Sequence, residues 1–250
     1  MRVSASIALA MALLSSPLAG QTAAPAATAA SSERSPDNVK LDEPRKPAEV
    51  LRFLGIKPGM TAMDLFGGNK YWAELMAPAV GPKGRVIVWE PTQFLDADTQ
   101  KGIDAFKAKN PNVTFVATPF EAIALPKNSA DVVMLNLNYH DTYWQSEKYK
   151  IPRMEPAAFL KTVYDAMKPG AVIAVIDHAA SPNSDTRATV EKMHRIDPDV
   201  VKADFKRAGF ILDASSDLLR NKTDDHSLPV FDPKVRGKTD RFIFKFKKPR

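Results

Sequence analysis

Apolar and polar residues alternate along this chain in two kinds of pattern. Short apolar runs are typical of strands, and longer stretches with apolar residues at helical spacing are typical of amphipathic helices. The apolar runs predict strands over residues 60–66, 85–89, 112–117, 130–137, 171–176, 210–214 and 241–247. The helical spacing predicts helices over residues 47–54, 70–80, 94–109, 154–167 and 198–208. Because helices separate most of the strands, the pattern is that of an α/β protein.

The strand patterns also predict how the sheet is built. The run 171–176 is apolar at nearly every position, as in a strand that is covered on both faces. The last strand, 241–247, instead alternates, with Phe242, Phe244 and Phe246 on one face. No helix precedes it, so it should run antiparallel to its neighbours. We therefore expect a Rossmann-like, seven-stranded, mostly parallel sheet with an antiparallel last strand and helices on both faces.

The segment 58–90 holds the most informative motif of the chain. Gly67 and Gly68 follow the first strand directly, Asp64 lies within that strand, and Glu90 closes the second strand. In an open α/β sheet, such a glycine turn brings backbone N–H groups close to a ligand. The carboxylate that closes the second strand is placed to bind ribose hydroxyls. We therefore expect Asp64 and Glu90 to flank a crevice for an adenosine-like group.

This segment resembles motif I of the class I S-adenosylmethionine-dependent methyltransferases, in which the turn reads acidic-x-Gly-x-Gly-x-Gly. Counted from Asp64, the three glycine positions hold Phe66, Gly68 and Lys70, so only the middle glycine matches. Lys70 would place a cation beside the sulfonium of the cofactor, where like charges repel, or would point outward from the start of the helix. The resemblance covers about residues 46–250 and implies the Rossmann-like methyltransferase fold with S-adenosylmethionine as cofactor.

Further residues extend the likeness. Lys168-Pro169-Gly170 resembles the turn before the family's fifth strand. A narrower group of signal-peptide-bearing bacterial methyltransferases is similar at Asn138 to Asp141, Asp177-His178, His194 to Asp197 and Arg236 to Phe242. The cofactor-binding residues that the resemblance implies are Asp64, Phe66, Gly67, Gly68, Glu90, Glu121 and Asn138. Among them, Asp64 and Gly68 would line the methionine end, Glu90 the ribose and Glu121 the adenine.

Three of the four histidines fall at the strand ends where an α/β sheet binds its ligands. His140 follows the fourth strand, His178 follows the fifth, and His194 precedes the next helix. We predict His140 as a general base that takes a proton from the methyl acceptor, because an imidazole of ordinary pKa suits that role at neutral pH. Asp141 or Asp177 would orient its ring. The predicted catalytic residues are His140, Asp141 and His178.

A divalent metal site is an alternative for the same side chains, since imidazole and carboxylate suit zinc or manganese. His140, His178 and His194 would supply ligands together with a neighbouring carboxylate. Their spacing matches no short metal-binding motif, so we predict no metal ligand.

Two segments near these histidines allow more than one interpretation. The aromatic residues Tyr139, Tyr143, Trp144 and Tyr149 form either a wall for a flat ligand or packing beneath a lid. The loop 217–240 is long for a hairpin, which predicts either a functional lid or a disordered segment. We assign no chemistry to Asp224-Asp225-His226, which has the composition of a loop tip.

Composition narrows the class of protein. The chain has 250 residues, with 44% hydrophobic and 26% charged residues, as in one soluble α/β domain. The net charge of +6 is modest, so we expect no nucleic-acid partner. The absence of cysteine excludes disulfides, thiolate metal sites and lipid attachment at cysteine.

The N-terminus predicts the compartment. Arg2, an apolar core over residues 3–14 and the small residue Gly20 have the layout of a secretory signal peptide. We expect a signal peptide over 1–20, a disordered linker rich in Ala, Ser and Pro over 21–40, and a single methyltransferase-like domain over 41–250. The mature protein would lie in a bacterial periplasm without a stable membrane span.

Three functions are compatible with the sequence. The first is a methyltransferase that transfers the methyl group of S-adenosylmethionine to a small-molecule or protein acceptor. The second is a non-catalytic ligand-binding protein on the same scaffold, which the altered turn at Phe66 and Lys70 and the export signal favour. The third is a metal-dependent hydrolase that uses the histidines.

Overall fold

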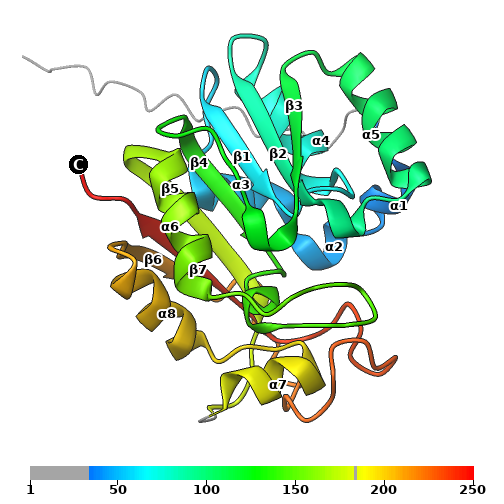
Figure 1. The fold of residues 1–250 in the computed structure, drawn as a ribbon, viewed down its shortest axis with the longest axis vertical. Coiled ribbons are helices and arrows are strands. Elements are labelled where there is room, and N and C mark those ends of the chain that lie inside the picture. Colours follow the sequence, from blue (N-terminus) through cyan, green and yellow to red (C-terminus); the bar gives the residue numbers. More distant parts are fainter. Residues whose placement is uncertain (1–33, 183–184) are drawn as a thin grey trace, which may run out of the picture.

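A seven-stranded sheet with helices on both faces forms the centre of the computed structural model, which describes residues 34–182 and 185–250 (Figure 1). Its strands are β1 Thr61–Leu65, β2 Arg85–Pro91, β3 Val113–Thr118, β4 Ala130–Asn136, β5 Met167–His178, β6 Ile211–Ser216 and β7 Arg241–Lys247. The helices are α1 Pro36–Val39, α2 Asp42–Arg45, α3 Pro47–Leu54, α4 Tyr71–Val80, α5 Ala97–Lys109, α6 Pro156–Ala166, α7 Thr186–Met193 and α8 Pro198–Arg207. Short 3-10 helices are η1 Thr92–Phe94, η2 Phe120–Ala122 and η3 His140–Tyr143.

The strand order is β3-β2-β1-β4-β5-β7-β6. Strands β1 to β5 pair in parallel, because a helix or a long connection returns the chain to the same edge after each strand. Strand β7 pairs antiparallel with both β5 and β6. The predicted fold, with its antiparallel last strand, is therefore confirmed.

Each face of the sheet has its own apolar core, because successive side chains of a strand point to opposite faces. Helices α6 and α8 cover one face and helices α3 and α4 cover the other (Figure 1). In β7, Phe242, Phe244 and Phe246 enter the first core, and Ile243 enters the second. Phe205 of α8 stacks on Phe246 with 4.3 Å between ring centroids. The alternation seen in the sequence thus sets the orientation of this strand.

The structure departs from the prediction at three places. In the N-terminal segment, helices α1 and α2 were not predicted, and α1 contains the buried Asn38, so the predicted linker over 21–40 extends too far. Residues 21–33 of that linker, like the predicted signal peptide, lie outside the described residues. Helix α7 was not predicted, because only Val190 of this helix is buried and the apolar spacing is therefore weak.

The third departure is at the start of β5. Residues 168–170 were predicted as a turn, but β5 begins at Met167 and contains them, with a register shift opposite Ala130 to Val132 and with Gly170 at φ 81°. Within residues 34–182 and 185–250, no helix combines the length and the apolar character that crossing a membrane requires.

Candidate functional site

The turn after β1 has the backbone conformation of a glycine-rich turn although two of its glycine positions hold other residues. Phe66 has φ 59° and Lys70 has φ 64°, both in the left-handed region that favours glycine. The Phe66 ring turns into the core, where its centroid lies 4.8 Å from that of Trp89. The turn therefore has a left-handed backbone at both positions where the expected glycine is missing.

Gly67 and Gly68 are the positions where this turn leaves no room for a side chain. A Cβ at Gly67 would lie 2.5 Å from Asp64 Oδ2, and a Cβ at Gly68 would lie 2.6 Å from Glu90 Cδ. The backbone N–H of Gly68 donates to Glu90 Oε2 at 2.8 Å. The two glycines thus allow both carboxyl groups to approach the turn.

A cavity of about 180 Å³, here called the turn cavity, lies beside this turn. Its lining consists of Arg45, Asp64, Leu65, Phe66, Asn69, Trp72, Asn136, Leu137 and Asn138. Three of the residues that line it have a buried polar atom without a hydrogen-bond partner within the described chain: Arg45 Nη1, Asp64 Oδ2 and Trp72 Nε1. Unpaired buried polar atoms are costly, so their gathering in one cavity is typical of a ligand site.

The N-terminal segment 34–45 brings Arg45 into this cavity. Arg34 forms a two-pronged ion pair with Asp42, with N–O distances of 2.6 and 2.8 Å, and the Tyr71 hydroxyl donates to Asp42 Oδ1 at 2.8 Å. The Asn38 side chain donates to the Asn69 carbonyl in the turn itself. The segment that was predicted partly as a linker is therefore part of the site.

Burial controls the charge of both carboxyl groups. Burial and, to a lesser extent, the neighbouring charge of Glu90 together raise the pKa of Asp64 to about 8. Burial also raises the pKa of Glu90 to about 7, against the hydrogen bond from Gly68. Asp64 therefore carries a proton at neutral pH although the Arg45 guanidinium, which lowers its pKa, lies nearby.

The predicted crevice between Asp64 and Glu90 is only partly present. Asp64 lines the turn cavity, but Glu90 does not, because its carboxylate is taken up by the turn. Lys70 Nζ lies 3.4 Å from the Gly68 carbonyl and attracts the Glu90 carboxylate. Glu121, predicted at the adenine, is exposed, accepts a hydrogen bond from Gln93 at 2.9 Å and lines a separate groove.

A second cavity of about 480 Å³, here called the histidine cavity, adjoins the turn cavity at Leu137 and Asn138, which line both. The other residues that line it are Phe94, His140, Asp141, Trp144, Tyr149, His178, His194, Val230 and Phe231. The predicted catalytic residues His140, Asp141 and His178 thus lie around one space, together with His194. Trp144 and Tyr149 form part of its wall, as one of the two interpretations of these aromatics expects.

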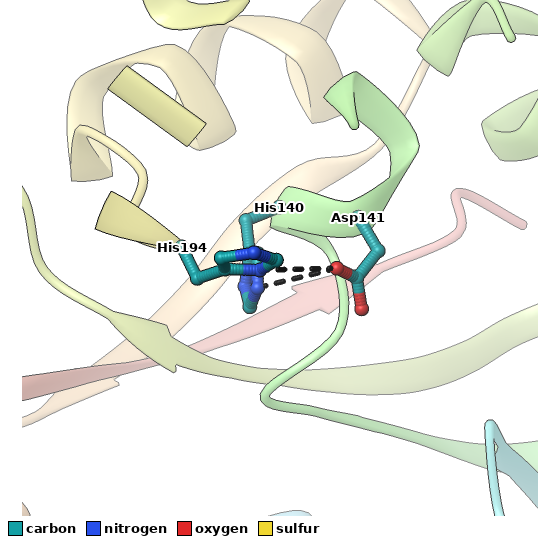
Figure 2. Close-up of side chains that lie close together, drawn as sticks. All are labelled: His140, Asp141 and His194. Atoms are coloured by element: carbon teal, nitrogen blue, oxygen red, sulfur yellow. Dashed lines mark ion pairs between the residues drawn. The ribbon is translucent and has the colours of Figure 1, made fainter. Parts of the chain in front are cut away.

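His140 is held between two aspartates, Asp141 on η3 and Asp177 near the end of β5. Figure 2 shows His140 beside Asp141 and His194. Its Nδ1 lies 2.7 Å from Asp177 Oδ1, and its Nε2 lies 3.3 Å from Asp141 Oδ1. Asp177 is fully buried and accepts hydrogen bonds from the backbone N–H groups of His140 and His178. His194 Nδ1 lies 3.9 Å from the same Asp141 oxygen.

These contacts set the protonation of His140, whose catalytic role stays a prediction. Burial lowers its pKa, but the charges of Asp177 and Asp141 outweigh burial and raise the pKa to about 9. His140 therefore holds a proton at neutral pH in this state. Burial lowers the pKa of His178 to about 3, and its Nδ1 lies 2.7 Å from the Thr239 hydroxyl, so this imidazole is neutral.

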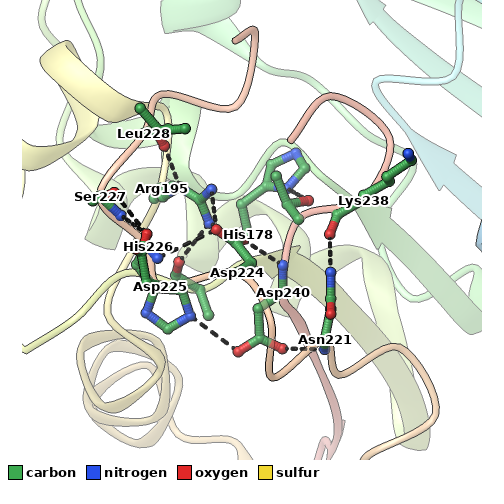
Figure 3. Close-up of polar contacts among 12 residues, drawn as sticks. His178, Arg195, Asn221, Asp224, Asp225, His226, Ser227, Leu228, Lys238 and Asp240 are labelled. Atoms are coloured by element: carbon green, nitrogen blue, oxygen red, sulfur yellow. Dashed lines mark hydrogen bonds and ion pairs between the residues drawn. The ribbon is translucent and has the colours of Figure 1, made fainter. Parts of the chain in front are cut away.

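The loop 217–240 is anchored by a buried polar network (Figure 3). The fully buried Arg195 pairs with both oxygens of Asp224, at 2.8 and 3.0 Å. Asp224 also accepts the backbone N–H of Asp240, and Asp240 in turn contacts His226 Nε2 at 3.0 Å. The loop is thus an ordered wall of the histidine cavity, and Asp224, assigned no chemistry from the sequence, has a structural role.

Several residues of the two cavities were not predicted from the sequence. They are Arg45, Asn69, Trp72 and Asn136 in the turn cavity and Phe94, Val230 and Phe231 in the histidine cavity. Arg45 precedes a predicted helix and Trp72 belongs to an apolar helical stripe, so neither stands in a pattern typical of a site. Asn136 lies one residue before the end of a predicted strand. Because ligands bind at the carboxyl ends of strands in open α/β sheets, this residue could have been predicted.

Comparisons with known proteins agree with this fold. UbiE of Hydrogenovibrio crunogenus, a ubiquinone/menaquinone biosynthesis C-methyltransferase, is 27% identical over 133 residues, which are 51% of this chain and 46% of the relative. The chain therefore spans about half the length of the curated relative that it matches. No protein-family model matches the chain.

Two solved structures illustrate the likeness in three dimensions. A SAM-dependent methyltransferase from Aquifex aeolicus has a TM-score of 0.58 at 20% identity and covers 85% of this chain and 93% of that one. The 1,6-didemethyltoxoflavin-N1-methyltransferase of Burkholderia thailandensis has a TM-score of 0.54 at 12% identity, over 86% of this chain and 80% of that one. The fold is therefore that of the class I S-adenosylmethionine-dependent methyltransferases, as the motif resemblance predicted.

Proposed function

We propose that this protein is an S-adenosylmethionine-dependent methyltransferase that acts on a small-molecule or protein acceptor. The observation that supports this most directly is the set of unpaired polar atoms in the turn cavity. Arg45 Nη1 and Trp72 Nε1 are hydrogen-bond donors, and Asp64 Oδ2 is an acceptor. Two donors and one acid match the carboxylate and the ammonium of an α-amino acid, which is the methionine end of the cofactor.

The position of the turn cavity agrees with this assignment. It lies at the carboxyl ends of β1 and β4, next to the left-handed turn, where ligands bind in open α/β sheets. Arg45, Asp64 and Trp72 would hold the amino-acid group, and the backbone of Gly68 would lie near the nucleoside. When bound, the cofactor supplies an activated methyl group on its sulfonium.

The histidine cavity is the proposed acceptor site. It shares Leu137 and Asn138 with the turn cavity, so an acceptor there would lie next to the donor. Methyl transfer depends mainly on alignment of donor, methyl group and acceptor, so a shaped cavity contributes most of the catalysis. The catalytic roles of His140, Asp141 and His178 stay predictions.

A titration of the purified mature chain tests the cofactor assignment. We expect saturable binding of S-adenosylmethionine and S-adenosylhomocysteine by calorimetry. Arg45→Met should weaken both at least tenfold, because a hydrogen bond to a charged group contributes about 1.5–3 kcal/mol. Arg52→Met, on the exposed side of α3, is the matched control and should bind as the parent does. Absence of saturation at millimolar ligand would refute the proposal.

The arrangement of Glu90 and Lys70 favours a second candidate function, that of a non-catalytic protein that binds an amino acid or another small ligand. The Glu90 carboxylate accepts a hydrogen bond from the backbone N–H of Gly68, and Lys70 Nζ lies near the Gly68 carbonyl. Both groups are where the ribose of the cofactor would bind. Free methionine and adenosine in the same titration separate the two candidates. A methyltransferase should bind S-adenosylhomocysteine much more tightly than methionine, whereas the second candidate should bind both alike.

A substitution at Lys70 extends this comparison. Lys70→Gly removes the cation and keeps the left-handed backbone. If this variant binds the cofactor and the parent does not, the second candidate is supported. Lys150→Gly is the control, because Lys150 also has a left-handed backbone, with φ 55°, but is exposed and lines neither cavity.

A further inference from the structure

His140, Asp141 and His194 converge on one point of the histidine cavity (Figure 2). One ligand atom from each side chain lies within 4.8 Å of the other two. His140 Nε2 and Asp141 Oδ1 are 3.3 Å apart, and His194 Nδ1 is 3.9 Å from the same oxygen. We propose that these three side chains form a binding site for a divalent transition-metal ion such as zinc.

The distances suit an ion of this kind. Bonds of about 2.0–2.1 Å in a tetrahedral arrangement separate neighbouring ligand atoms by about 3.3 Å. The pair His140–Asp141 already has this separation, and His194 Nδ1 is about 0.6 Å farther than this from Asp141 Oδ1, with all three ligand atoms within 4.8 Å of one another. His194 follows the last residue of α7, and its side chain is partly exposed. Its ring can therefore adjust more easily than the buried ring of His140.

The groups behind the three ligands add an independent argument. A metal-binding histidine usually donates its second ring N–H to a carboxylate, which fixes the tautomer and the orientation of the ring. His140 Nδ1 has this partner in Asp177 Oδ1 at 2.7 Å, and Asp177 is itself held by two backbone N–H groups. The Asn138 side chain donates to Asp141 Oδ2 at 3.0 Å, which leaves Oδ1 for the ion.

The cavity around the three ligands indicates what kind of metal site this is. Structural zinc sites have four protein ligands, whereas catalytic sites keep a position open for water or substrate. The proposed site has three ligands and faces a space of about 480 Å³ that is walled by Trp144 and Phe231. An ion there would therefore have a free position for an oxygen-bearing ligand, as a Lewis acid requires.

His178 does not belong to the site, although the sequence suggested it as a ligand. Its Nδ1 is bound to the Thr239 hydroxyl, and its ring centroid lies 6.0 Å from that of His140. Asp141 is the neighbouring carboxylate that the sequence left unnamed, and it completes the set of three ligands.

Zinc titration of the mature, tag-free chain tests this proposal without the methyl donor. We expect about one equivalent of zinc to be retained after dialysis, measured by elemental analysis, and visible absorption bands on binding of Co²⁺. His194→Asn should lower the zinc affinity at least tenfold, because it removes a ligand while asparagine tolerates the left-handed backbone at φ 49°.

Lys150→Asn is the matched control. Lys150 also has a left-handed backbone, at φ 55°, but is exposed and does not line the histidine cavity, so this variant should bind zinc as the parent does. Asp141→Asn is a second ligand variant, and circular dichroism checks that each variant is folded. Less than a tenth of an equivalent of zinc in the parent, or equal affinity in parent and His194→Asn, would overturn the site. Neither result bears on the binding of S-adenosylmethionine.

Discussion

Asp64 illustrates how the fold gives a side chain properties that the neighbouring sequence does not specify. The motif places an acid at the end of a buried strand, but only the packed structure removes it from water and leaves its second oxygen unpaired. Burial and the nearby Glu90 then keep the carboxyl protonated at neutral pH. A bound ammonium group would favour the charged form, so ligand binding at neutral pH should release a proton.

The raised pKa of Asp64 predicts how stability depends on pH. The folded protein keeps this proton up to about pH 8, whereas the unfolded chain releases it near the ordinary pKa of about 4. The folded state therefore binds more protons between these values, and the free energy of unfolding should fall as the pH rises from 4 to 8. Glu90, with a pKa of about 7, adds to this fall.

Urea unfolding of the ligand-free protein at several pH values measures this dependence. In Asp64→Asn, the fall in the free energy of unfolding between pH 5 and 8 should be smaller by a few kcal/mol, because the amide does not titrate. Glu121→Gln, the same kind of change at an exposed carboxyl group, should leave the slope as in the parent. An equal slope in the parent and Asp64→Asn would contradict the assignment.

At the scale of elements, the loop between β6 and β7 is the segment for which the structure differs most from the sequence-based interpretation. Its length predicted a lid or disorder, but Arg195 binds Asp224 and the carbonyl oxygens of Ala179 and Leu228. Phe231 of this loop packs on the His194 ring, with 4.9 Å between centroids. The loop thus shapes the histidine cavity because a buried arginine anchors it.

Removal of this anchor should destabilise the whole domain. Arg195→Met leaves Asp224 buried without its charge partner, which typically costs about 3–5 kcal/mol. Arg236→Met, at an exposed position of the same loop, should change stability by no more than about 0.5 kcal/mol. Chemical denaturation compares the two variants. A loss below about 1 kcal/mol in Arg195→Met would show that the network contributes little.

Elements with strong apolar periodicity were predictable, and elements held by polar contacts were not. Helix α3 and strand β7 have the predicted bounds, because their apolar faces meet the two cores. Helices α1 and α2 are held instead by the contacts of Arg34, Asp42 and Asn38 with residues far along the chain. Polar contacts of this kind leave no periodic pattern in the sequence.

At the scale of the whole molecule, the parallel sheet gathers the proposed functions at one edge. Asp64 comes from β1, Asn136 from β4 and Asp177 from β5, and all lie toward the carboxyl ends of their strands. The same edge receives segment 34–45 from one side and loop 217–240 from the other. The two cavities therefore adjoin although their residues are far apart in sequence.

The N-terminal pattern leads us to propose that the protein is exported to the periplasm. Expression in a Gram-negative host should give a mature chain that begins near Gln21, because the apolar core ends in small residues that permit cleavage. Mass spectrometry of the N-terminus, with fractionation of the cells, measures this. Leu13→Arg should leave the precursor in the cytoplasm, and a parent chain that keeps Met1 there would refute the proposal.

The sequence by itself determined the order of the strands and of helices α3 to α6 and α8, the reversed last strand and the position of the glycine turn, because apolar periodicity and turn residues act over short distances. It also indicated the histidines at the strand ends. Only the tertiary structure decided that Glu90 is taken up by its own turn, that Arg45 reaches Asp64, and that Asp141 joins His140 and His194. These outcomes depend on burial and on contacts between distant segments, which no local pattern specifies.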